Sequence, residues 1–97
     1  MKAYLLVFDP SQTTRKEVIE KIDRMPAISN WYAFFNNTIC LASAKEARSL
    51  SGLLHADLPT LRFIITEINP QSKGGWLPKS IWAFLNNPQP ADNPADA

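Results

Sequence analysis

Two residue types that build covalent or metal-linked sites are almost absent, because the 97 residues include one cysteine and one histidine. A single cysteine excludes an internal disulfide, and the two residues together are too few for a cysteine–histidine zinc site within one subunit. Cys40 lies in the apolar stretch TICLA, where a free cysteine usually behaves as a small buried hydrophobic residue. We expect His55 at the end of a helix, where the helix dipole favours a cation, and not as a general base.

An excess of one charge and long apolar runs are also missing. Ten Lys and Arg residues against nine Asp and Glu give a net charge of +1. This balance excludes a strongly basic nucleic-acid binder but permits a local basic patch. The apolar run near the N-terminus is too short for a secretion signal, and no segment reaches the length of a membrane span. We therefore expect a cytoplasmic protein with no membrane partner.

Apolar residues are plentiful, at 45% of the chain, and they form short runs that predict strands. The run AYLLVF, closed by Asp9, is typical of a central strand covered on both faces. Two aromatic and β-branched runs flank Asn36-Asn37, and because asparagine tolerates positive φ, a two-residue type I′ hairpin turn is predicted there. The predicted strands are residues 3–8, 29–35, 38–42 and 61–68.

Helix signals separate these strands. Thr14 with Glu17, and Ser43 with Glu46, have the spacing of capping boxes at helix starts. Apolar residues then recur at helical spacing and indicate an amphipathic helix after each box. The predicted helices run from about residue 14 to 24, from the second capping box to about residue 55, and over residues 78–87.

The order β-α-β-β-α-β followed by a helix predicts an α+β fold, a ferredoxin-like antiparallel sheet with an extra C-terminal helix. One domain is expected over residues 1–87, including the helix 78–87, and the proline-rich residues 88–97 are expected to be a disordered tail. Two helices on one face of such a sheet leave its other face open to water. We expect the C-terminal helix and a second subunit to cover that apolar face.

Asp9 is the main candidate for chemistry. A carboxylate at the end of a central strand lies at a sheet edge, and two of them from a symmetric dimer could share one Mg²⁺ or Mn²⁺. Such a metal could activate a water for attack on a phosphodiester. The competing interpretation is that Asp9-Pro10-Ser11 is only a turn, since Asp and Pro suit its first two positions. Glu67 could join Asp9, although a solvated edge charge is the favoured interpretation.

The C-terminal segment contains the second set of candidates. Trp76, Trp82 and Phe84 make it more apolar than a free helix could be, so these three residues are predicted to form an interface. The preceding Gly74-Gly75 reads as a hinge and not as a phosphate-binding loop, because no GxGxxG or Walker spacing is present.

The succession of the first strand ending in Asp9, the hairpin NWYAFFNNTICLAS, the strand LRFIITEI and the closing GWLPKSIWAFL resembles known families. It is similar to the small CRISPR-associated spacer-acquisition nucleases and to the virulence-associated protein D group, and closest to uncharacterised small bacterial proteins near them. The resemblance covers residues 1–87. It implies a ferredoxin-like homodimer in which only Asp9 matches the metal-binding acid of the nuclease members. Pro10, where those families usually have polar or basic residues, departs from the pattern.

Three functions are consistent with these features. The leading hypothesis is a nucleic-acid-associated, nuclease-like homodimer with Asp9 as the metal ligand. The second is a non-catalytic protein-interaction module that uses the aromatic C-terminal segment to bind a protein partner. The third is a small-molecule regulatory dimer, since many functions occur on this type of fold.

Overall fold

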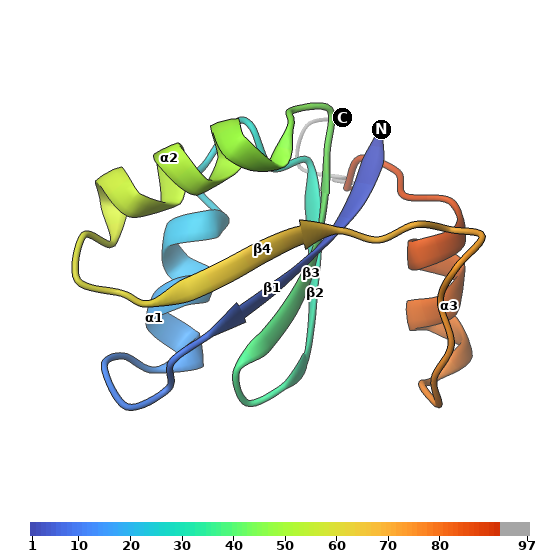
Figure 1. The fold of residues 1–97 in the computed structure, drawn as a ribbon, viewed down its shortest axis with the longest axis horizontal. Helices are drawn as coiled ribbons and strands as arrows, with labels where there is room; N and C mark the ends of the chain where they lie inside the picture. The colour runs from blue at the N-terminus through green and yellow to red at the C-terminus, as the bar shows by residue number, and fades with distance from the viewer. Residues whose placement is uncertain (92–97) are drawn as a thin grey trace.

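Seven secondary-structure elements follow one another in the computed structural model of this protein, which describes residues 1–91 (Figure 1). In chain order they are β1 (Lys2–Phe8), α1 (Arg15–Ile22), β2 (Asn30–Phe35), β3 (Thr38–Ser43), α2 (Ala47–Asp57), β4 (Phe63–Glu67) and α3 (Lys79–Asn86). This succession confirms the predicted order of strands and helices and the α+β class. The ends of the elements differ from the predicted ends by a few residues.

The strands form one antiparallel sheet in the order β2-β3-β1-β4. β1 is an interior strand, with Leu5 opposite Cys40 of β3 on one side and Thr66 of β4 on the other. This position explains its unbroken apolar sequence, because an interior strand with layers on both faces has little contact with water. β2 and β4 are the two edge strands.

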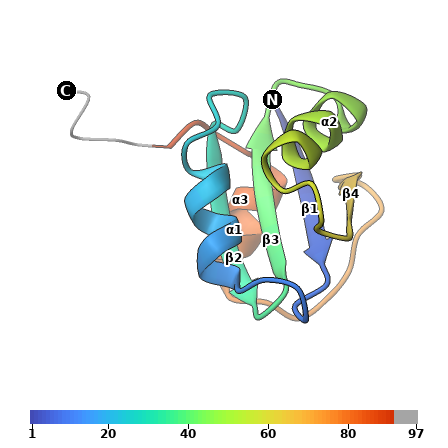
Figure 2. The ribbon, with the colours of Figure 1, turned by 90° about the vertical axis from the view of Figure 1, so that its left-hand side faces the viewer.

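α1 and α2 both cover one face of the sheet, called here the inner face (Figure 2). Side chains alternate between the faces of a strand, so Tyr4, Leu6 and Phe8 of β1 point to this side. The buried core on the inner face includes Tyr4, Leu6, Phe8, Val18, Ile22, Ile39, Leu41, Leu50, Leu54 and Leu61. α1 begins as predicted, since the backbone N–H of Glu17 donates to Oγ1 of Thr14 at 3.2 Å.

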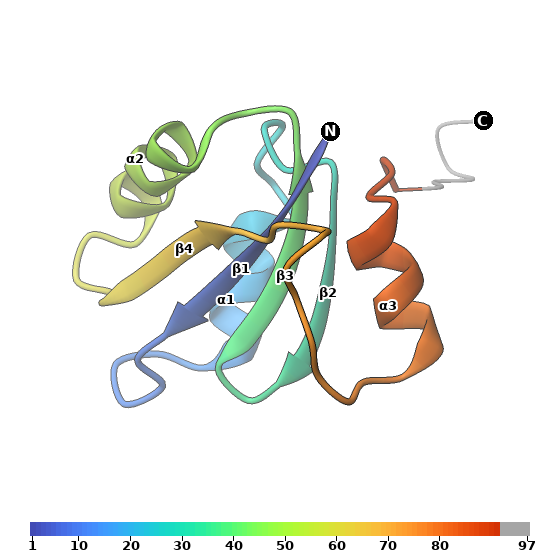
Figure 3. The same cartoon turned by 45° about the vertical axis from the view of Figure 1, so that its right-hand side comes forward.

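α3 lies against the opposite, outer face, on the side of β2 and β3 (Figure 3). Its contacts with the sheet form a second buried cluster of Ala3, Cys40, Ala42, Ile81, Phe84 and Leu85. The expectation that the C-terminal helix covers part of the open face is thus confirmed. The cover is incomplete, because Leu5 and Val7 are only half-buried and Ile64 of β4 is 63% exposed.

The hairpin between β2 and β3 is at the predicted place but has a different turn. Phe35 is opposite Thr38, which leaves Asn36-Asn37 as the two-residue loop. A type I′ turn needs positive φ at both central residues, and no non-glycine residue among 1–91 has it. The predicted turn type is therefore wrong. An irregularity in the pairing between Ala33 and Phe35 accompanies the different turn.

The capping box predicted at Ser43 and Glu46 is also wrong. α2 begins at Ala47, and its N-cap residue Glu46 makes no side-chain capping hydrogen bond. The hydroxyl of Ser43 is buried instead, where it donates to the carbonyl of Ala27 at 2.6 Å and accepts from the backbone N–H of Lys45 at 3.0 Å. Ser43 thus ties the end of β3 to the segment before β2, a contact between distant residues that a local spacing rule does not detect.

The residues after α3 return to the start of β2. The backbone N–H of Ala91 donates to the carbonyl of Ser29 at 2.8 Å, and the side-chain amide of Asn30 donates to the carbonyl of Gln89 at 3.3 Å. The tail predicted to be disordered, 88–97, is described only as far as residue 91, and its remainder lies outside the described residues.

Candidate functional site

Asp9 directly follows β1, where the chain turns towards α1. Its backbone N–H donates to the carbonyl of Arg62 at 2.9 Å, which holds the residue beside the start of β4. Its Oδ1 accepts hydrogen bonds from the hydroxyl of Ser11 at 2.7 Å and from the backbone N–H of Ser11 at 2.9 Å. The Ser11 hydroxyl, followed by the Ser11 backbone N–H, lowers the pKa of Asp9 below its usual value. This is the geometry of a turn that begins with aspartate.

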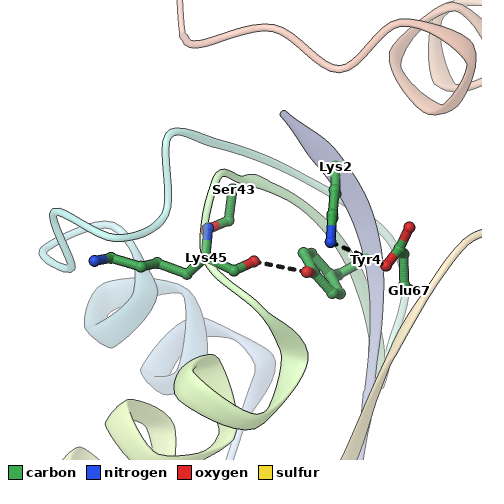
Figure 4. Close-up of polar contacts among 5 residues, drawn as sticks. All are labelled: Lys2, Tyr4, Ser43, Lys45 and Glu67. Atoms are coloured by element: carbon green, nitrogen blue, oxygen red, sulfur yellow. Dashed lines mark hydrogen bonds and ion pairs between the residues drawn. The ribbon is translucent and has the colours of Figure 1, made fainter.

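Glu67 does not join Asp9. Glu67 is opposite Tyr4 in the sheet, whereas Asp9 follows Phe8, which is opposite Phe63 at the other end of β4. The carboxylate of Glu67 pairs with the ammonium of Lys2 at 3.6 Å (Figure 4). It is therefore a partly solvated edge charge, as the sequence favoured.

The part of the chain that the structure describes contains no group of three or more His, Cys, Asp or Glu residues placed to hold a metal ion. A divalent cation bound by oxygen takes six or more ligands, of which waters can supply several. A metal at Asp9 would therefore need waters, substrate oxygens or a second subunit to complete its shell.

The three predicted interface aromatics occupy different environments. Phe84 is buried at 8% exposure, and its ring meets that of Tyr32 edge to face with centroids 5.7 Å apart. Trp82 is half-buried beside Gly75, with the ammonium of Lys73 6.0 Å from the centre of its ring. Trp76 is 99% exposed. Phe84 thus serves the core of its own chain, and Trp76 is the residue of the three that is free to meet a partner.

A groove of about 590 Å³ lies between the uncovered part of the outer face and the segment 72–77, and we call it the outer groove. It is open to solvent. Its apolar lining includes Leu5, Val7, Phe34, Phe35, Trp76 and Trp82. This size is within the usual range of ligand pockets, and the apolar lining is typical of them.

Among residues 1–91, Lys73 is the one charged residue that lines the outer groove. Its ammonium donates to the carbonyl of Pro70 at 2.7 Å, which leaves two of its three donors for other partners. Arg15, the first residue of α1, donates through its guanidinium to the carbonyl of the groove residue Phe35 at 3.3 Å, but Arg15 is not part of the lining. The groove is therefore apolar with one cation, Lys73, in its described lining.

The sequence did not identify Leu5 and Val7 as site residues. Both belong to the apolar run of β1 and were expected only to be covered by the last helix or by a second subunit. α3 has 8 residues and is about 12 Å long, so it is too small to cover a four-stranded sheet.

Cys40 and His55 take the places expected of them. Cys40 is 0% exposed, its thiol donates to the carbonyl of Tyr32 at 3.4 Å, and burial raises its pKa to about 11. A thiol that stays protonated at neutral pH is a poor nucleophile, so Cys40 belongs to the core. His55 is exposed in the last turn of α2.

No family model matches this chain, and neither a curated protein nor a solved structure matches it. Among residues 1–91, every helix is too short to cross a lipid bilayer. The geometry of the site is thus the basis for any functional proposal.

Proposed function

We propose that this chain is a non-catalytic binding module whose outer groove holds an apolar segment of a partner protein. The observation that carries the proposal is Trp76, a 99% exposed tryptophan at an apolar groove. Exposed tryptophan is costly in water, and tryptophan is one of the residues that most often dominate the binding energy of protein interfaces.

Other exposed apolar side chains lie at the same face. Phe35, which lines the groove, is 55% exposed, and Ile64, which pairs with the groove residue Val7, is 63% exposed. Scattered apolar residues on a surface need no explanation, but a cluster around one hollow is typical of an interaction site. A second hollow, of about 550 Å³, lies beside α2, but three of its lining residues are charged, and of the exposed large apolar residues among 1–91 only Leu53 lines it.

Charge indicates what the partner segment contains. Lys73 lines the groove, and no acidic residue among 1–91 is part of the lining. An aspartate or glutamate beside the apolar residues of the ligand would meet the Lys73 ammonium, and complementary charge favours correct encounter. We therefore expect a short apolar segment with at least one acidic residue.

We also propose that the fold is a ferredoxin-like variant. The element order, the antiparallel pairing and the position of α1 and α2 on one face support this assignment. Because that fold hosts many functions, the assignment adds no weight to any of them.

A displayed library of random peptides tests the binding proposal directly. We expect selected peptides to combine apolar residues with Asp or Glu, and Trp76→Ala to weaken their binding by about tenfold or more. Leu53→Ala is the matched control, since Leu53 is 44% exposed on α2 and lies away from the groove. Equal binding to wild type and Trp76→Ala would refute the proposal.

A nuclease-like function remains the second proposal, with Asp9 as a ligand for Mg²⁺ or Mn²⁺. One observation favours it: Asp9 directly follows the interior strand β1, at the end of the sheet, where its carboxylate can bind a cation. The test is cleavage of single- and double-stranded DNA and RNA by wild type and Asp9→Ala with each metal. Metal-dependent cleavage that Asp9→Ala loses without unfolding would support this function. No cleavage, or equal cleavage, would leave Asp9 as a turn residue.

A further inference from the structure

The two edges of the sheet differ in how they are protected from other chains. At β2 the pairing is irregular between Ala33 and Phe35, and the segment 89–91 forms hydrogen bonds with Ser29 and Asn30. Bulges and covering segments are the usual means of protecting an edge strand. β4 has neither of them: its register with β1 is continuous from Phe63 to Glu67, and it contains no proline.

The backbone of β4 leaves a regular row of unpaired groups. The carbonyl of Arg62 accepts from Asp9, and the N–H of Ile68 donates to Ala3, so the even-numbered residues of this stretch face β1. The N–H and C=O groups of the odd-numbered residues, Phe63, Ile65 and Glu67, therefore point away from the sheet. Within residues 1–91, no strand pairs with this side of β4.

We propose that β4 pairs with β4 of a second copy of this chain, antiparallel and across a two-fold axis at Ile65. Phe63 of each copy then lies opposite Glu67 of the other, and the two Ile65 residues face each other. All three odd-numbered positions become hydrogen-bonded pairs, which gives about six new backbone hydrogen bonds. The two sheets join into one continuous sheet of eight strands.

The side chains are compatible with this register. On the outer face, Ile64, which is 63% exposed in the single chain, lies opposite Thr66 of the second copy. No like charges meet, because Glu67 faces Phe63 and retains its ion pair with Lys2. A cross-strand pair of β-branched residues stabilises a sheet, whereas opposed like charges would destabilise it.

The arrangement also explains why association stops at two copies. A two-fold axis uses the same edge of both chains, so the remaining edges of the dimer are the two protected β2 strands. Both outer grooves lie on the same side of the joined sheet, with the Ile64 residues between them. A partner with two apolar segments could then bind both grooves, which raises its apparent affinity.

This dimer can be separated from the other proposals. In this dimer the two β1 strands are three strand spacings apart, and the two Asp9 residues lie at opposite ends of the joined sheet. They are therefore more than about 20 Å apart, too far to share one metal ion. The outer groove consists of residues of one chain alone. If the protein does not dimerise, a monomer can still bind a peptide in the outer groove. If no peptide binds, the dimer can still form through β4.

Glu67→Pro is the decisive variant, with Glu67→Ala as its matched control. Both lose the ion pair with Lys2, but only proline removes the outward N–H and places its ring against the second copy. Light scattering after size exclusion, over a series of concentrations, should give the mass of two chains for wild type and for Glu67→Ala. We expect the dissociation constant of the Glu67→Pro dimer to be about tenfold higher or more than that of the Glu67→Ala dimer. When both variants are monomeric, their unfolding midpoints should be close to each other.

A cross-linking experiment tests the register. Ile64→Cys and Thr66→Cys are placed in separate chains and mixed under oxidising conditions. The mixture should form a disulfide-linked heterodimer, whereas each variant alone should not, because equal positions are offset by two residues in this register. A monomeric wild type at all concentrations, unchanged dimerisation of Glu67→Pro, or cross-linking of either variant alone would overturn the proposal.

Discussion

The inner and outer faces of the sheet are built from the same strands but are covered to different extents. Leu6 of β1 points to the inner face and is 0% exposed beneath the layer of α1 and α2. Its neighbour Leu5 points to the outer face, which the shorter α3 covers only in part, and is half-buried in the outer groove. The inner face therefore holds most of the closed core, and the outer face leaves apolar surface exposed.

The largest expected effect compares these two leucines. Leu6→Ala should lower the free energy of unfolding by about 3–4 kcal/mol, because a closed core cannot fill the cavity. Leu5→Ala should lower it by about 1 kcal/mol, since less surface returns to water. Urea unfolding followed by circular dichroism measures both. Equal losses would show that the two faces contribute alike and that the outer groove is closed in solution.

A second comparison separates structure from binding within the outer face. Phe84→Ala should cost about 3 kcal/mol of stability, because its ring is part of the buried cluster under α3. Trp76→Ala should change stability by no more than about 0.5 kcal/mol while it weakens peptide binding. Thermal unfolding of both variants checks the pair. A large loss of stability in Trp76→Ala would place that residue in the core and remove it from the interface.

The order of elements was predictable because the apolar residues of each segment recur with one clear spacing, that of a strand or that of a helix. The apolar run of β1, the helix start at Thr14 and the hairpin position at Asn36-Asn37 all follow from neighbours in sequence. The two errors, the type of hairpin turn and the role of Ser43, involve geometry that depends on the assembled sheet. The hydroxyl of Ser43 reaches Ala27, which is 16 residues away, and no local rule detects such a contact.

The candidate site was less predictable than the fold. Phe84 and Trp76 were expected to share one interface, yet the spacing of Ile81, Phe84 and Leu85 already fits a buried helical stripe that excludes Trp76. The outer groove depends on how far α3 extends over the sheet. The free edge of β4 depends on strand order, which the sequence does not contain in any local pattern.

The smallest expected effect compares the two buried ionisable groups among residues 1–91, one on each face. On the inner face the hydroxyl of Tyr4 donates to the carbonyl of Lys45 at 2.6 Å, and burial raises its pKa above 10.0 (Figure 4). On the outer face burial raises the pKa of Cys40 from 9.0 to about 11. In both cases folding favours the protonated form. The stability that each contributes is therefore complete below its unfolded pKa and is lost as pH rises through its folded pKa.

Two conservative variants separate these contributions. Tyr4→Phe should lower the free energy of unfolding by about 1 kcal/mol at pH 7, because the hydrogen bond is lost. This gap between the variant and wild type should narrow above pH 10, where wild type loses the contribution of Tyr4. As pH rises from 9 to about 11, Cys40→Ala should lose less stability than wild type, because wild type loses the contribution of the thiol in this window. The window is set by the unfolded and folded pKa values of Cys40. Urea unfolding at intervals from pH 7 to 12 measures both. If the Tyr4→Phe gap stays constant throughout, folding does not raise the pKa of Tyr4, and the inner face at Tyr4 is more open to water than the outer face at Cys40.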